Sequence, residues 1–264
     1  MLPVLLALLC AHPPSGARTC EACHPAQTQT YAPSAHAQAF SNPLFQASWE
    51  HSRWRAWCLS CHDPLGGKRG LTCESCHNDL TAQVTDDVCG HCHQFFAPED
   101  RFADVPMQDT VGEWRRSGTT KTCVECHFPK GDHRSKGGHD LPLLQQTLRV
   151  RWEKGCAVVE ATGAGHAVPT GDPFHTLRLS LCADAPCAVR LASQSLLRRV
   201  EPGDGGRFAR TLDTRPQPGQ RLCFAPSSAT HWILEVRHAE LALDAAAPAD
   251  ERWKVIHTGG LPGE

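Results

Sequence analysis

Five cysteine pairs, each followed directly by a histidine, are the residues of this chain best suited to chemistry. The spacing Cys-x-x-Cys-His occurs at 20–24, 58–62, 73–77, 89–93 and 123–127, here called motifs 1 to 5. Two thiols at this spacing can add to the vinyl groups of one porphyrin, and the adjacent imidazole then reaches the iron. Zinc ribbons also use such cysteine pairs, but they do not need a histidine directly after each pair. The motifs therefore predict five covalently attached c-type haems.

Each motif assigns three residues to its haem. The predicted attachment residues are Cys20, Cys23, Cys58, Cys61, Cys73, Cys76, Cys89, Cys92, Cys123 and Cys126. The predicted proximal iron ligands are His24, His62, His77, His93 and His127. No residue is predicted to be catalytic.

The ligand on the other side of each iron decides whether a haem carries electrons or binds a substrate. Apart from Met1 the chain has only Met107, so nearly all the irons must have a second histidine or an open position. The predicted distal ligands are His36, His51, His133, His139 and His166, with His175 in reserve. Structural or surface roles are expected for His91, His231, His238 and His257.

The first residues have the character of an export signal. Residues 2–10 are apolar but too few to span a bilayer, and Ser15, Gly16 and Ala17 suit a signal peptidase. Residues 1–17 are therefore predicted to be a signal peptide, although no Lys or Arg precedes the apolar stretch. Lipidation at Cys10 is the alternative, and it alone would attach the protein to a membrane. Because covalent haem attachment also requires export, the predicted location is periplasmic or extracellular.

Four cysteines lie outside the motifs and the leader: Cys156, Cys182, Cys187 and Cys223. An even number of such cysteines in an exported protein predicts two disulfides. Cys182 and Cys187 flank a short Ala-Asp-Ala-Pro segment, so a bond between them can close a hairpin. Cys156 and Cys223 would then be joined to each other.

A change of composition divides the chain into a pentahaem domain, 18–142, and a β-sandwich-like domain, 143–264. The first contains all five motifs but no isoleucine, so the porphyrins must supply its apolar mass. Helices are predicted near 40–60 and 110–117. The second contains short apolar or alternating runs separated by Gly, Pro and Asp, which predict antiparallel strands. These runs are 148–152, 157–160, 177–181, 189–191, 221–224, 232–236 and 253–256. The predicted class is α+β.

Composition and motifs also limit the partners. A formal net charge of -2 gives no electrostatic reason to bind nucleic acid or an anionic membrane surface. There is no nucleophile elbow, P-loop or dinucleotide fingerprint. The expected partners are redox proteins, and a homo-oligomer is compatible with the sequence.

Several segments around the motifs resemble a known family. CLSCHDP at 58–64, GLTCESCH at 70–77 and CVECHFPKGDH at 123–133 are similar to segments of multihaem cytochromes, as are MQDTVGEW at 107–114, GHDLPLL at 138–144 and GHAVPTGDP at 165–173. The family is related to the tetrahaem cytochrome that takes electrons from hydroxylamine oxidoreductase. The resemblance implies closely packed haems, distal ligation by His36 and His51, and a C-terminal β-domain. The fifth haem and Phe128, where relatives often have Met, depart from the family pattern.

Three functions are compatible with these features. Electron transfer is favoured, because the short segments 63–72 and 78–88 force neighbouring porphyrins close together. A nitrogen-oxide or hydroxylamine-type oxidoreductase would need one five-coordinate haem. However, the chain has no Cys-x-x-Cys-Lys and only one tyrosine, Tyr31. The third alternative is a subunit of an extracellular haem filament that uses the β-domain as its contact surface.

Overall fold

The computed structural model describes residues 17–53, 55–77, 83–96, 105–170, 175–203, 208–225, 228–237 and 253–260. The chain divides into two compact units. The first is Met1–Cys92 with Lys121–Lys136, and the second is His93–Thr120 with Gly137–Glu264. Residues 93–120 therefore belong to the same compact unit as the strands. The domain boundary predicted at 142 instead places them with the motifs. Cys10, His12 and all of the leader except Ala17 lie outside the described residues, as does His238.

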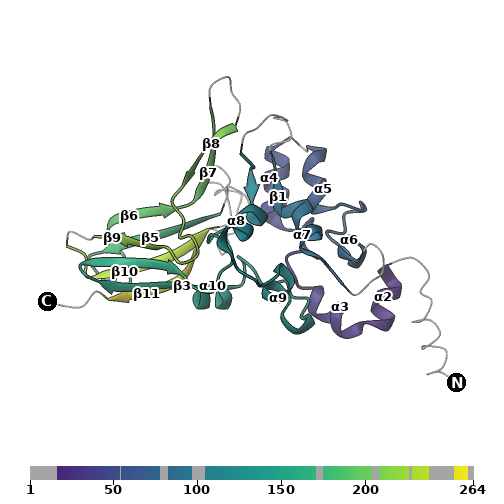
Figure 1. Cartoon of the computed structure of the whole chain (residues 1–264), viewed down its shortest axis with the longest axis horizontal. Coiled ribbons are helices and arrows are strands. Elements are labelled where there is room, and N and C mark those ends of the chain that lie inside the picture. Colours follow the sequence, from purple (N-terminus) through teal and green to yellow (C-terminus); the bar gives the residue numbers. More distant parts are fainter. Residues whose placement is uncertain are drawn as a thin grey trace. The chain divides into compact units, whose positions relative to one another are not determined.

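The first unit consists of short helices. They are α2 (Ala17–Cys23), α3 (Pro25–Tyr31), α4 (Pro43–His51), α5 (Leu59–His62), α6 (Cys73–Cys76), α7 (Asp86–His93), α9 (Cys123–His127) and the 3₁₀ turns η1 (Ala56–Cys58) and η2 (Pro129–Gly131) (Figure 1). Helices this short are not stable alone and depend on tertiary contacts. Yet among the described residues of this unit, only Leu44 and Phe45 are buried apolar side chains. The described residues of this unit therefore form little hydrophobic core of their own.

The described residues of the second unit form two helices and all of the strands. The helices are α8 (Thr110–Ser117) and α10 (Leu141–Thr147), and α8 has the bounds predicted from the sequence. The strands are β1 (Gln94–Phe95), β2 (Gln108–Asp109), β3 (Leu148–Glu153), β4 (Cys156–Ala161), β5 (Thr176–Cys182), β6 (Arg190–Leu196), β7 (Arg198–Pro202), β8 (Phe208–Asp213), β9 (Arg221–Phe224), β10 (His231–Arg237) and β11 (Lys254–Gly260). Helices and antiparallel sheets together make the chain α+β, in agreement with the sequence.

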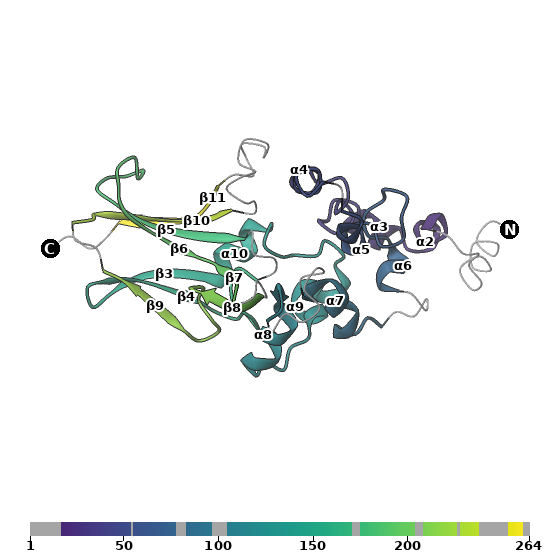
Figure 2. The same ribbon diagram turned by 90° about the horizontal axis from the view of Figure 1, so that it is seen from above.

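Two antiparallel sheets of this unit pack as layers (Figure 2). One has the strand order β11-β10-β5-β6 and the other β3-β4-β9. Val159 of β4, Leu179 of β5 and Leu234 of β10 are at most 1% exposed and belong to one shared core. Residue Glu235, next to Leu234, faces the other side of its strand and forms ion pairs with Arg178 and Arg190. This alternation gives the β-sandwich that the sequence predicted.

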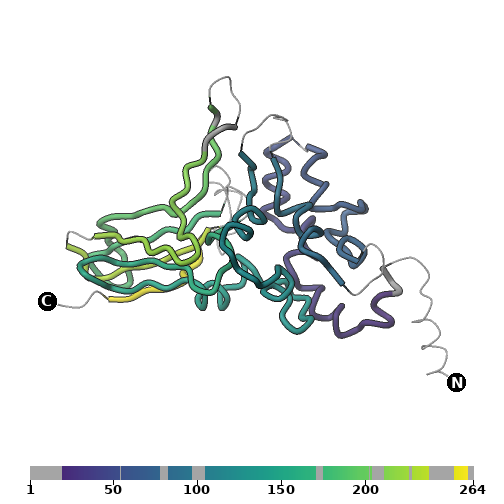
Figure 3. The backbone as a smooth tube through the Cα atoms, viewed as in Figure 1, coloured from purple at the N-terminus to yellow at the C-terminus, as the bar shows by residue number. Residues whose placement is uncertain are grey.

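The remaining strands form two small ribbons. β1 pairs with β2, and β7 pairs with β8 in a hairpin that can be followed in Figure 3. Neither ribbon was predicted, because their residues are mostly polar or charged and show no apolar run. For the same reason the predicted run 189–191 covers only the start of β6. Among the described residues, no helix has the length and apolar character needed to cross a membrane.

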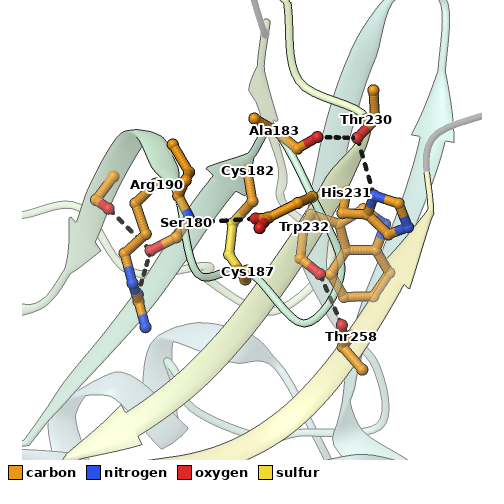
Figure 4. The surroundings of a disulfide bond; sticks show 12 residues. Ser180, Cys182, Ala183, Cys187, Arg190, Thr230, His231, Trp232 and Thr258 are labelled. Atoms are coloured by element: carbon orange, nitrogen blue, oxygen red, sulfur yellow. Dashed lines mark hydrogen bonds between the residues drawn. A yellow bond between two sulfur atoms is a disulfide. The ribbon is translucent and has the colours of Figure 1, made fainter.

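Both predicted disulfides are present in the second unit. Cys156 of β4 is bonded to Cys223 of β9, and their Cα atoms are 5.4 Å apart. Cys182 and Cys187 close the turn that follows β5, with Cα atoms 5.2 Å apart (Figure 4). Beside this turn, the Thr230 hydroxyl donates to the carbonyl of Ala183 at 2.8 Å.

The two disulfides should differ in their effect on stability, because the unfolded chain gains more freedom when a longer loop is opened. Their sequence separations are 67 and 5 residues. We expect Cys156→Ala/Cys223→Ala to cost about 4 kcal/mol of unfolding free energy, and Cys182→Ala/Cys187→Ala about 2 kcal/mol. Proteolysis of the full holoprotein at increasing urea concentration measures the unfolding free energy of both variants. An equal or reversed order would contradict the chain-entropy explanation.

Candidate haem sites

Each motif lies on or at the end of a helix. α9 contains all of motif 5, and the helical residues of α7 include motif 4. Motif 3 forms α6 with His77 as its C-cap, motif 2 spans η1 and α5, and motif 1 ends α2 with His24 beginning α3. In a helix, residues at positions i, i+3 and i+4 share one face. In motifs 2 to 5 the two thiols and the imidazole are therefore directed to the same side, where one porphyrin can bind them, whereas Cys23 of motif 1 is disulfide-bonded in this structure.

The sequence around each motif explains why these short helices form. The Thr122 hydroxyl accepts a hydrogen bond from the Glu125 backbone N–H at 3.1 Å, while the Glu125 carboxylate accepts one from Thr122 N–H at 2.7 Å. This reciprocal capping satisfies donors at the start of α9. The pair Thr72 and Ser75 caps α6 in the same way. Local capping therefore defines where α6 and α9 begin.

His62 of motif 2 is held from two directions. Its Nδ1 donates to the Ala39 carbonyl at 3.0 Å, so the lone pair of the ring is on Nε2. Its ring also stacks on that of buried Phe45, with centroids 3.8 Å apart and planes 8° from parallel. His127 of motif 5 likewise donates from Nδ1 to the Lys136 carbonyl at 2.5 Å. Both imidazoles are in the tautomer that binds iron through Nε2.

The thiols of different motifs lie beside one another. The pKa of the Cys61 thiol falls to about 6 because Cys92 donates a hydrogen bond to its sulfur. A hydrogen bond from Cys123 likewise lowers the pKa of Cys89. These contacts join motif 2 to motif 4, and motif 4 to motif 5.

Two further contacts involve motif 3. Burial, followed by the neighbouring Cys20 sulfur, raises the pKa of the Cys73 thiol to about 11. Burial and then the Cys89 sulfur raise the pKa of Cys76. Motif 3 is thus next to motifs 1 and 4. These thiols titrate only before haem attachment, but the contacts reveal which attachment positions are neighbours.

Tyr31, the only tyrosine, is packed against motif 3. Its hydroxyl donates to the Leu71 carbonyl at 2.8 Å, which ties α3 to the segment before α6. Burial raises the pKa of this phenol, and the sulfurs of Cys76 and Cys73 raise it further. Tyr31 therefore remains a neutral hydrogen-bond donor at ordinary pH.

His77 and His133 have the spacing of two ligands on one iron. Their ring centroids are 6.4 Å apart and their planes differ by 32°. A metal–imidazole bond of about 2 Å, with about 1.1 Å from the nitrogen to the ring centre, gives about 6.2 Å between two opposed imidazoles. The Nδ1 of His133 donates to the Gly131 carbonyl at 2.7 Å, so its lone pair is also on Nε2. Sequence reasoning named both residues but did not pair them.

The other predicted distal ligands have varied surroundings. His36 donates to or accepts from the Ser135 hydroxyl at 2.8 Å, and burial followed by the nearby His127 lowers its pKa. His51 ends α4 with an exposed side chain. These placements bring His36 close to motif 5 and leave His51 at the surface of the first unit.

His139, His166 and His175 belong to the second unit. The rings of His139 and His175 have centroids 6.3 Å apart and planes at 79°. His166 donates from Nδ1 to the carbonyl of Ala167 at 2.9 Å. The loop holding it approaches α8 closely, because a Cβ on Gly165 would lie 2.8 Å from the Thr119 methyl group. The ring of His175, which the sequence held in reserve as a ligand, thus lies beside that of His139.

Other histidines have structural contacts. The Nε2 of His257 lies 3.0 Å from the Leu148 carbonyl and 3.1 Å from that of Gln145, so this nitrogen is a donor. His231 contacts the Thr230 hydroxyl at 2.9 Å through Nδ1. These contacts agree with the structural roles expected from the sequence.

The residues present fit c-type haem. Motifs 2 to 5 direct two thiols and an imidazole to one side, and the separation of His77 and His133 is close to that of two imidazoles on one iron. Among the described residues of the first unit, Leu44 and Phe45 are the buried apolar side chains, so porphyrins could supply the missing apolar mass. These residues could therefore hold haem by attachment and axial ligation.

Comparison with known proteins supports the fold. No protein-family model and no curated protein matches the chain. A solved structure, the crystal structure of a penta-heme cytochrome c552 from Thermochromatium tepidum, matches with a TM-score of 0.69 at 19% sequence identity. The match covers 94% of this chain and 99% of that chain. The two proteins therefore share a fold over nearly their whole lengths.

The pairing of His77 with His133 can be tested by substitution. We expect His133→Ala to open one iron, which should give a high-spin EPR signal and binding of carbon monoxide to one haem. The control is His257→Ala, because His257 uses its Nε2 as a donor to backbone carbonyls. Unchanged spin states in His133→Ala, with all five haems attached, would contradict the pairing.

Proposed function

We propose that this chain is an exported electron-transfer protein that carries five covalently attached c-type haems, most of them with two histidine ligands. Each haem would supply an iron that gains and loses one electron without forming or breaking other bonds. Five complete attachment motifs support this assignment, and the protein of similar fold is described as a penta-heme cytochrome. The chain's own part is to attach the haems, fix their ligands and set their order.

The contacts between motif thiols are the observation that carries the proposal. Each thiol marks the vinyl edge of its porphyrin, so touching thiols imply adjacent porphyrin edges. Hydrogen bonds between thiols connect motif 1 to 3, motif 4 to 5 and motif 2 to 4, and the Cys89 sulfur acts on Cys76 through its charge, which places motif 3 near motif 4. All five positions belong to one connected path, with motif 4 at its branch point. A single catalytic haem would not need such a network.

Ligation supports the same conclusion. His133 keeps its lone pair on Nε2, and its ring centroid lies 6.4 Å from that of His77. An iron held between two imidazoles has no position for a substrate, and bis-histidine ligation favours a low reduction potential. The enzymatic alternative requires one iron without a distal histidine.

Export and partners complete the proposal. Covalent haem attachment takes place outside the cytoplasm, so the protein would act in the periplasm or beyond the cell, anchored only if Cys10 is lipidated. Its partners would be redox proteins that dock near the ends of the path. Nothing in its charge favours nucleic acid.

The haem content and ligation provide the direct test. We expect five haems per polypeptide from intact mass and from pyridine haemochrome absorbance. Low-temperature EPR of the oxidised protein should show low-spin iron throughout. Fewer than five haems would contradict the cofactor assignment, and a stoichiometric high-spin signal would instead favour the oxidoreductase.

The branch at motif 4 gives a second prediction. Cys89→Ala/Cys92→Ala removes the central haem, so electrons injected by flash photoreduction should no longer equilibrate quickly among the remaining four. Cys58→Ala/Cys61→Ala is the matched control, because motif 2 is a side branch and its loss leaves the path through motifs 1, 3, 4 and 5 intact. Equal rates in the two variants would contradict the inferred order.

A further inference from the structure

The proximal histidine of motif 4 has a different partner from those of motifs 2 and 5. His62 and His127 donate from Nδ1 to backbone carbonyls, whose positions are fixed by the main chain. The Nδ1 of His93 instead lies 2.9 Å from the side-chain amide nitrogen, Nε2, of Gln108. The position of the Gln108 side chain depends on its own contacts, and these contacts can therefore affect the His93 imidazole. The backbone carbonyls beside His62 and His127 offer no such route.

Gln108 is held firmly in this position. It lies on β2, where it is paired with Phe95 of β1, and its side chain is 6% exposed. Upstream, the guanidinium of buried Arg198 donates to the carbonyls of Pro106 and Met107 at 2.7 Å each. Both sides of the β1–β2 pair are therefore fixed, and the amide has little freedom to leave His93.

A buried chain of polar groups continues from Gln108. Its amide lies 3.3 Å from the Thr110 hydroxyl, which is 3.0 Å from the hydroxyl of Thr170. Thr170 donates to the Glu113 carboxylate at 2.8 Å, and the other oxygen of Glu113 pairs with Arg215 at 2.5 Å. Glu113 and Arg215 are 6% and 3% exposed. Because water is excluded from this ion pair, its field is weakly screened along the chain.

We propose that Gln108 is a positioning residue for His93, and that through it the Thr110–Thr170–Glu113–Arg215 network sets the reduction potential of the iron at motif 4. The inference rests on the proposed function, since it takes His93 as an iron ligand. An imidazole that binds iron through Nε2 keeps its proton on Nδ1, so the Gln108 amide must turn from its present orientation to place its oxygen there. The same oxygen would then accept from the Thr110 hydroxyl, which now accepts from the Gln108 nitrogen. A better acceptor at Nδ1 makes the imidazole a stronger donor and stabilises ferric iron.

Two substitutions should act in opposite directions. Gln108→Glu places a carboxylate against Nδ1, so one of the five redox components should move to lower potential. Gln108→Leu removes the acceptor, so the same component should move to higher potential. We expect about a tenfold change in the equilibrium constant for reduction in each case, which corresponds to about 59 mV for one electron. Spectroelectrochemical titration of the holoprotein measures the shift, and the EPR g-values of one low-spin haem should change with it.

Gln94 provides the matched control. It lies on the neighbouring strand, but its amide contacts the Asp109 side chain and the Gly112 backbone. Gln94→Glu adds the same charge nearby. Unlike Gln108→Glu, it should leave all five redox components at the potentials of the unsubstituted protein. Thr110→Val, which breaks the network without touching His93, should cause a smaller shift of the component that Gln108 controls.

The possible outcomes separate this inference from the proposed function. Opposite shifts in one component, absent from the Gln94 variant, support the role of Gln108. Shifts in the same direction in both Gln108 variants indicate only a loosened structure and overturn it, as does no shift with five haems attached. A protein without haem at motif 4 would instead refute the proposed function itself.

Discussion

In the proposed cytochrome, the attachment of each haem through two thiols and one imidazole would be the constraint on which the first unit depends. Its helices are too short to be stable by themselves, and its described residues include only two buried apolar side chains. Local caps such as Thr122 with Glu125 define the motif helices but supply little cohesion. The proposed macrocycles would supply the apolar mass that brings the helices together. They would also account for the small amount of aliphatic sequence in the unit.

The second unit is stabilised in a different way. Its two sheets bury a continuous aliphatic core, and disulfides join β4 to β9 and close the turn after β5. Arg198 and Arg215 reach from the strands to the segments around β2 and α8. A rigid sandwich thus fixes the residues that surround His93. Such support is needed, because an error of a fraction of an ångström in an imidazole changes both its bond to iron and its hydrogen bond.

Features that are local in the sequence were the ones that could be predicted. The motifs, α8, β9 and both disulfide pairings followed from spacing and apolar runs. Contacts between distant segments could not be predicted in this way. His133 meets His77 only because the loop after α9 folds back, and no pattern in the sequence encodes that return. Likewise Gln108 is one polar residue on a two-residue strand, so only the pairing of β1 with β2 reveals its contact with His93.

If the chain carries five irons of similar ligation, as proposed, it faces one further physical requirement. When the axial ligands are all imidazoles, ligand identity cannot distinguish the reduction potentials of the irons, so the surroundings must do so. The structure offers two kinds of surroundings. His62 and His127 donate to main-chain carbonyls, which any sequence would provide, whereas His93 contacts a side chain connected to a buried ion pair. This second kind is found at motif 4, where three neighbouring motifs meet. An iron at a branch point exchanges electrons with every neighbour, and its potential therefore decides how charge is divided among the branches.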